Sequence, residues 1–142
     1  MSYREILVPL DLGEHSEPIA RRCLALAQGW GAQVRLLHVV PFMPVEPMNE
    51  SLVPVVQLDT ALVGKAREQL LGLAAGLGVA ADRCSVVTGS VKGEILRAVR
   101  EHQCDLIVLG ARERHGLSIL VHRTEDTVLH GAPCDVLVLR TR

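Results

Sequence analysis

Two kinds of apolar pattern alternate along this chain of 142 residues. In the first, apolar residues follow one another in short continuous runs, which predict strands buried on both faces of a sheet. In the second, they recur every three or four positions, which predicts helices with one buried face. The predicted strands are 5–10, 33–40, 83–88, 105–110 and 135–140. The predicted helices are 17–30, 60–77, a short one around 95–99, and 117–130.

Strand and helix alternate four times, and a fifth strand closes the series. This alternation predicts an α/β fold with an open, doubly wound, parallel sheet and helices on both faces. We infer the strand order 3-2-1-4-5. The chain contains no internal repeat and has the length of one ordinary domain, so we expect residues 1–142 to form a single domain.

Gly, Pro and Asp mark the ends of several predicted elements. Pro9 indicates where the first strand leaves the sheet, because proline cannot donate to a strand ladder. Asp59 is a suitable N-cap for the second helix, and Gly78 is a suitable residue to follow its last turn. Residues 42–56 are rich in Pro and Met and show no period, so we expect an irregular loop there. Such a loop serves as a lid or interaction surface, or is simply variable.

Composition and charge exclude several classes of function. Hydrophobic residues make up 49% of the chain, which argues against disorder, and no apolar run approaches the roughly 18 residues of a membrane span. The formal net charge is -1, and Trp, Tyr and Phe each occur once. We therefore expect no nucleic-acid partner and no membrane partner.

The cysteines and the start of the chain indicate the compartment. The four cysteines form no C-x-x-C pair and no cluster with histidine. We interpret them as free thiols in a reducing cytoplasm. The first strand begins almost at once, so we expect no signal peptide.

The stretch 105–125 is the strongest candidate for a ligand site. A buried strand ends at Gly110 and is followed by a basic loop with a second glycine, Gly116, and then by a helix. Backbone N–H groups and the helix dipole at such a junction favour an anion. Arg112 and Arg114 lie in this loop and could grip phosphate, although they could equally be solvated loop residues.

The inferred strand order brings other residues to the same place. Ligands of doubly wound sheets bind beyond the carboxyl ends of the strands, where the strand order reverses. Here the reversal falls between the first and fourth strands, so Pro9, Leu10 and Asp11 should lie beside Gly110. Val39, at the end of the second strand, should lie at the same edge. Asp11 could contact a nucleotide or order Mg²⁺, or it could cap the first helix.

The chain resembles the universal stress protein (UspA) family over nearly its whole length. The residues that carry the resemblance are Ile6 to Asp11 with Ser16, His38 to Val40, Gly89 with Ile95, Asp105 to Gly110, and Pro133 to Val138. The resemblance implies a cytoplasmic, Rossmann-like and adenine-nucleotide α-hydrolase-like fold of five parallel strands. It also implies a homodimer, commonly formed through the last strands. An unpaired apolar edge strand is an aggregation hazard, so we expect pairing through Val136, Leu137 and Val138.

Part of this family binds ATP through a pattern of Gly, two residues, Gly, nine residues, Gly, and then Ser or Thr. In this chain Gly110 and Thr124 match the pattern, but Glu113 and Arg123 replace the second and third glycines. Glycines let the backbone approach phosphates closely, and a carboxylate repels them. Thr124 could bond a phosphate or be packed within its helix.

These departures leave two functions open. One is a homodimeric stress-response module with an impaired or absent ATP site. The other is an adenine-nucleotide protein that binds ATP or AMP with Mg²⁺ and could hydrolyse ATP slowly. In that case Arg112, Arg114, Gly116 and Arg123 would rebuild the phosphate site. The chain lacks the motifs of hydrolases, zinc enzymes and P-loop proteins, so we assign no catalytic residue and no metal site. It also lacks the glycine-serine loop, after the first strand, of electron-transfer flavoprotein-like or pyrophosphatase-type enzymes.

Overall fold

The computed structural model describes residues 2–41, 54–112, 128 and 130–141. The described residues form one five-stranded sheet in the order β3-β2-β1-β4-β5, and every neighbouring pair is parallel. The predicted fold class and strand order are therefore confirmed. The strands are β1 (Glu5–Pro9), β2 (Gln33–Pro41), β3 (Cys84–Gly89), β4 (Leu106–Arg112) and β5 (Asp135–Thr141). The described residues also include the helices α1 (Ser16–Trp30), α2 (Pro54–Leu77) and α3 (Val91–His102), with a 3₁₀ turn, η1 (Ala81–Arg83), before β3.

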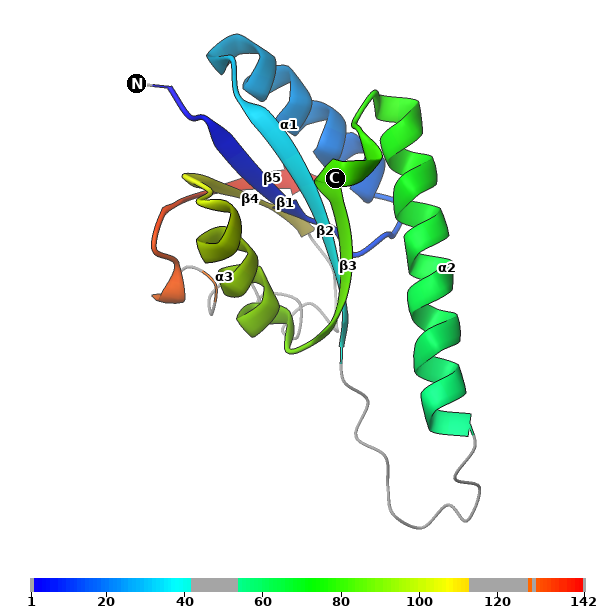
Figure 1. Cartoon of the computed structure of the whole chain (residues 1–142). Coiled ribbons are helices and arrows are strands. Elements are labelled where there is room, and N and C mark those ends of the chain that lie inside the picture. Colours follow the sequence, from blue (N-terminus) through cyan, green and yellow to red (C-terminus); the bar gives the residue numbers. More distant parts are fainter. Residues whose placement is uncertain (1, 42–53, 113–127, 129, 142) are drawn as a thin grey trace.

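The sheet separates two apolar cores, and different helices cover its two faces (Figure 1). Ile6 and Val8 of β1 point to the face covered by α1 and α2. Leu7, between them, points to the face covered by α3 and by Val128. This alternation is the period-two geometry of a strand, and it explains why both sides of the central strands are apolar.

Three predicted boundaries are wrong. β4 does not stop at Gly110 but continues to Arg112, because Gly110, Ala111 and Arg112 still pair with β5. α2 begins at Pro54, so the irregular segment does not extend to 56, and Asp59 lies inside the helix rather than at its cap. Proline suits the first position of a helix, where an N–H has no partner to lose. The rest of that segment, 42–53, lies outside the described residues.

The end of α2 follows the prediction for Gly78. Gly78 has a left-handed φ of 77°. The Val79 N–H donates to the Ala74 carbonyl at 2.9 Å, and the Gly78 N–H donates to the Ala75 carbonyl at 3.4 Å. This pair of bonds is a Schellman motif, which satisfies carbonyls at the helix end.

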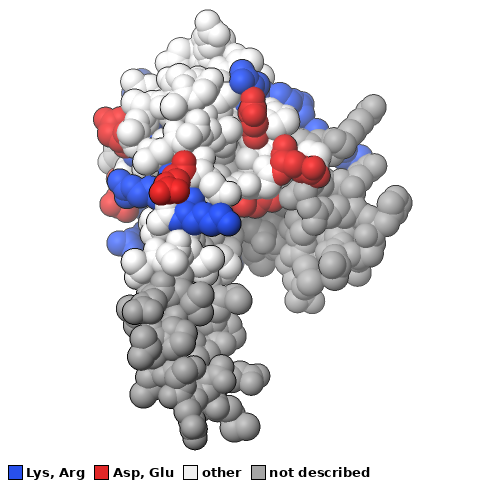
Figure 2. All heavy atoms as spheres, turned by 90° about the vertical axis from the view of Figure 1, so that its right-hand side faces the viewer, with Lys and Arg blue, Asp and Glu red and all other residues white. Residues whose placement is uncertain are grey.

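The surface over α2 carries charges of both signs. In Figure 2 the Lys and Arg side chains on this face lie among Asp and Glu side chains, with no broad patch of one sign. None of the helices in the described part combines the length and apolarity that crossing a bilayer requires.

Two glycines at the end of α2 should respond to alanine with opposite signs. Gly78→Ala should lower the free energy of unfolding by about 1–2 kcal/mol, because an L residue is strained at positive φ. Gly76→Ala is the matched control: a Cβ there meets open space, so the variant should gain about 0.5–1 kcal/mol of helix propensity. Urea unfolding of both variants measures the difference, and a change of the same sign in both would contradict this account of the helix end.

Candidate functional site at the carboxyl edge of the sheet

The carboxyl ends of β1 and β4 lie at the same edge of the sheet, where the strand order reverses. Leu7 of β1 is opposite Ile107 of β4. From this pair, β1 runs on to Pro9 and β4 runs on to Arg112. Pro9 therefore ends β1, and Leu10 and Asp11 follow it, at the edge at which β4 ends, as the strand order predicts.

The Asp11 carboxylate organises the loop between β1 and α1. Its Oδ1 atom accepts a hydrogen bond from the Gly13 N–H at 2.8 Å and another from the Ser16 hydroxyl at 3.1 Å. Ser16 is the first residue of α1 and is only 5% exposed, so this bond satisfies a buried hydroxyl. Leu12, between Asp11 and Gly13, has a left-handed φ of 63°. Asp11 thus fixes the loop through local bonds.

The alternative role predicted for Asp11, the cap of the first helix, is wrong. The N-cap residue of α1 is His15, and no side chain of the described residues caps it. The Oδ1 atom of Asp11 bonds the Ser16 side chain. The Ser16 N–H donates to the Gly13 carbonyl at 3.1 Å, and Pro18 has no N–H. The first turn of α1 therefore has few donors left for an anion.

His38 ties β2 to the end of β1. Its Nδ1 atom lies 2.7 Å from the Leu10 carbonyl oxygen. A carbonyl can only accept, so Nδ1 carries the proton in this bond. The Leu10 N–H in turn donates to the Leu37 carbonyl at 2.8 Å. The sequence places His38 in a predicted strand but does not reveal this contact, which joins residues far apart in the chain.

Leu10 and Val39 are too buried to offer much side-chain surface to a ligand. Each is 7% exposed. Val39 packs with Leu7 and Ile95 in the core beneath α3, whereas Leu10 belongs to the core beneath α1 and α2. The surface of the edge is therefore formed by the exposed Asp11 and the half-buried Pro9. The side chains of Leu10 and Val39 lie beneath that surface.

Gly110 has a structural role of its own. It lies within β4, opposite Leu139 of β5. A Cβ at this position would lie 2.7 Å from Cδ1 and 3.0 Å from Cγ1 of Ile19 in α1. Ile19 is almost fully buried, so it has little room to move aside. The packing of α1 on β4 therefore accounts for a glycine at this position without a ligand.

The other predicted site residues lie at the end of β4 or beyond it. Arg112 is its last residue, and only its backbone is described. Arg114, Gly116, Arg123 and Thr124 lie outside the described residues, and their roles stay predictions. No three His, Cys, Asp or Glu side chains come together as a metal-binding group in the described ranges.

The thiols are protected rather than reactive. Burial raises the pKa of Cys23 to about 12 and the pKa of Cys104 to about 11. Burial also raises the pKa of Cys84 and of Cys134. Since the thiolate is the nucleophile, all four are weakly reactive at neutral pH.

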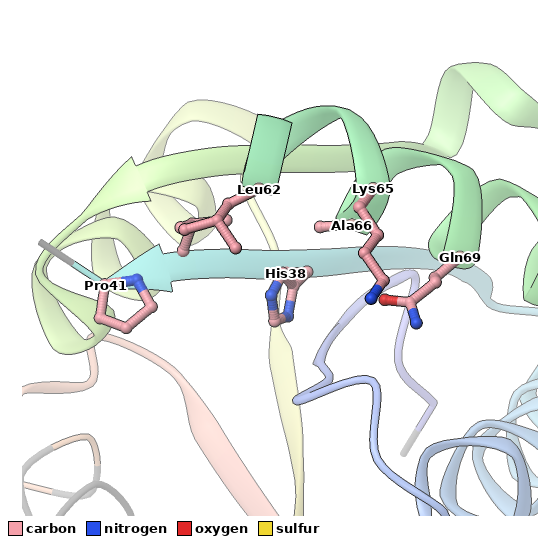
Figure 3. A pocket seen from close by; sticks show the side chains of 7 residues that line it. His38, Pro41, Leu62, Lys65, Ala66 and Gln69 are labelled. Carbon is pink, nitrogen blue, oxygen red and sulfur yellow. The ribbon is translucent and has the colours of Figure 1, made fainter. Parts of the chain in front are cut away.

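A pocket that the sequence did not reveal lies beside this edge, on the opposite side of β2 from Val39. It has a volume of about 360 Å³ and lies between the end of β2 and one side of α2 (Figure 3). His38 and Pro41 contribute from β2, and Leu62, Lys65 and Gln69 from α2. The lining residues of α2 are three or four positions apart, which indicates that they share one side of the helix. This spacing does not identify the strand that faces them.

The contact between Gly110 and Ile19 can be tested by a double-mutant cycle. Gly110→Ala should destabilise the protein by about 1–3 kcal/mol, because the added methyl overpacks a dense core. In an Ile19→Val background, which lacks Cδ1, the cost should be clearly smaller. Urea unfolding supplies the values, with Gly29→Ala as a control in open space. An equal cost in both backgrounds would show that Ile19 does not impose the glycine.

Comparisons with known proteins agree on one family. Residues 2–140 match the model of the Universal stress protein family. Universal stress protein A homolog 2 of Coxiella burnetii is 31% identical over 99% of this chain and 97% of its own.

Solved structures share the fold. Universal stress protein UspA from Lactobacillus plantarum is 27% identical, with 99% of both chains covered and a TM-score of 0.68. A universal stress protein solved in complex with cAMP is 17% identical, with 98% of both chains covered and a TM-score of 0.62, and shows the fold alone. Sequence and fold thus lead to the same conclusion, and this chain belongs to the universal stress protein family.

Proposed function

We propose that this universal stress protein is a homodimeric stress-response module of the cytoplasm whose ATP site is impaired or absent. The observation that carries the proposal is the packing of Gly110 against Ile19. Gly110 is the only glycine of the family's ATP pattern that this chain keeps. Because helix packing already accounts for it, its presence is not evidence for a nucleotide.

The rest of the pattern points in the same direction. Glu113 places a carboxylate and a Cβ where the pattern has a glycine, and Arg123 replaces another. A carboxylate repels phosphates, and a side chain holds the backbone away from them. The first turn of α1 adds little, because the Ser16 N–H and one oxygen of Asp11 are already hydrogen-bonded.

The homodimer rests on the exposed edge of the sheet. β5 is an edge strand, and its Val138 is 39% exposed. Val136 and Leu137 are half-buried and pack against the two cores. Of the three residues predicted to form the interface, Val138 is therefore the one most available to a partner. Pairing with β5 of a second copy would cover the strand and satisfy its outer backbone groups.

The cytoplasmic location rests on the thiols. All four cysteines are free, and two of them lie in the cores. A chain that keeps four unpaired cysteines suits a reducing compartment.

The alternative is an adenine-nucleotide protein that binds ATP or AMP with Mg²⁺. It is favoured by the exposed Asp11 at the switch point and by the cAMP complex of a protein with the same fold. In this alternative Arg112, Arg114, Gly116, Arg123 and Thr124 would form the phosphate site.

Nucleotide titration separates the two functions. Calorimetry of the nucleotide-free protein with ATP or AMP, with and without Mg²⁺, should give no binding heat at millimolar ligand. The double variant Glu113→Gly/Arg123→Gly restores the family pattern and should gain ATP binding. Micromolar binding by the wild-type protein would overturn the proposal in favour of the alternative. An unchanged double variant would show that the missing glycines are not the cause.

The dimer can be tested at one residue. Light scattering of the wild-type protein at micromolar concentration should give twice the mass of the chain. Val138→Lys should give the monomer mass, because a lysine on an edge strand blocks pairing. Leu62→Lys is the control, since Leu62 is 44% exposed on α2 and should leave the dimer intact. A monomeric wild-type protein would contradict the proposed interface.

A further inference from the structure

The pocket between β2 and α2 combines an apolar floor with polar groups at one end. Leu62, Lys65, Ala66 and Gln69 line it from successive turns of one side of α2. Figure 3 shows Lys65 and Gln69 side by side at one end, Leu62 and Pro41 at the other, and His38 between them. The volume of about 360 Å³ lies near the lower end of the roughly 300–1,000 Å³ typical of small-molecule sites.

The polar groups of this pocket offer hydrogen-bond donors. Among the residues that the structure describes, neither Lys65 nor Gln69 has a hydrogen-bond or ion-pair partner. Lys65 carries a full positive charge and three donors, and the Gln69 amide supplies two more. The bond from His38 Nδ1 to the Leu10 carbonyl holds the imidazole ring in place.

Among the described residues that line the pocket, no negative group balances the lysine. These residues include no Asp or Glu, and besides Lys65, Gln69 and His38 they are Val40, Pro41, Leu62 and Ala66. One ammonium beside an apolar wall matches a ligand with one negative charge and an apolar body. A phosphate dianion fits less well, because its second charge would be desolvated without a second cation.

We infer that this pocket binds a small monocarboxylate with an apolar chain. The carboxylate accepts hydrogen bonds from the Lys65 ammonium and the Gln69 amide. The chain lies along Pro41 and Leu62, the latter being 44% exposed in the structure. Covering this side chain removes apolar surface from water, which is favourable.

This site is separate from the switch-point edge. His38 and Val40 line the pocket on the α2 side of β2, whereas Val39 packs beneath α3 on the other side. The inference does not depend on the proposed function, and carboxylate binding is measured independently of nucleotide binding.

Octanoate is a suitable probe. Titrated into the ¹⁵N-labelled full chain, it should shift the backbone amide signals of residues 38–40 and 62–69. Octanol, which has the same chain without the charge, should bind at least about tenfold more weakly, because it forms no charge-assisted hydrogen bond. The shifts should saturate at one site.

Lysine variants test the role of charge. Lys65→Met should weaken octanoate binding by about tenfold, and Lys65→Arg should keep most of the affinity. Lys92→Met, the matched control on α3, should bind as the wild type does. The inference is overturned if octanol binds as well as octanoate, if Lys65→Met leaves the affinity unchanged, or if the shifts map elsewhere. Lys65 and Lys92 are both exposed, so the folding of all three variants is readily verified by thermal melting.

Discussion

The burial of the central strands on both faces is the constraint from which the rest of this structure follows. Ile6, Leu7 and Val8 of β1 and Ile107 and Val108 of β4 are all fully buried. Parallel strands of this kind need helices on both sides of the sheet. The chain meets this need by placing α1 and α2 on one face and α3 on the other. Because the connecting helices switch from one face to the other after β3, the strand order reverses between β1 and β4. This reversal determines the edge of the sheet at which a ligand would bind.

The same packing changes how the family's nucleotide pattern is interpreted. Gly110 serves the contact between α1 and β4, which any member with this arrangement of side chains would need. A glycine in a ligand motif can thus be retained for the fold while the ligand is lost. The other two glycines of the pattern are replaced in this chain by Glu113 and Arg123.

Features with a local cause could be predicted from the sequence. The continuous apolar runs gave the strands, and the alternation with helices gave the order that the structure confirms. Gly78 was predicted as the residue after α2 because helix ends have a local signature. The start of α2 at Pro54 was missed, since proline occurs in loops as well as in first helical turns.

Features that join distant segments could not be predicted. The role of Gly110 depends on Ile19, and the orientation of His38 depends on the Leu10 carbonyl. The pocket needs the register of α2 against β2, which no periodicity within α2 specifies. The positions of Pro9 and Asp11 at one edge do follow from the strand order. The bonds of Asp11 to Gly13 and Ser16 are local but were also missed, because a loop Asp can cap the following helix instead.

The central proposal is that this universal stress protein keeps the family fold while the ATP site at its switch-point edge is impaired or absent. Native mass spectrometry of the protein as purified from cells, without any stripping step, tests it most directly. The account predicts a homodimer whose mass is that of two chains alone. A dimer that carries ATP or AMP on each chain would contradict it, because the edge would then hold a nucleotide despite Glu113 and Arg123.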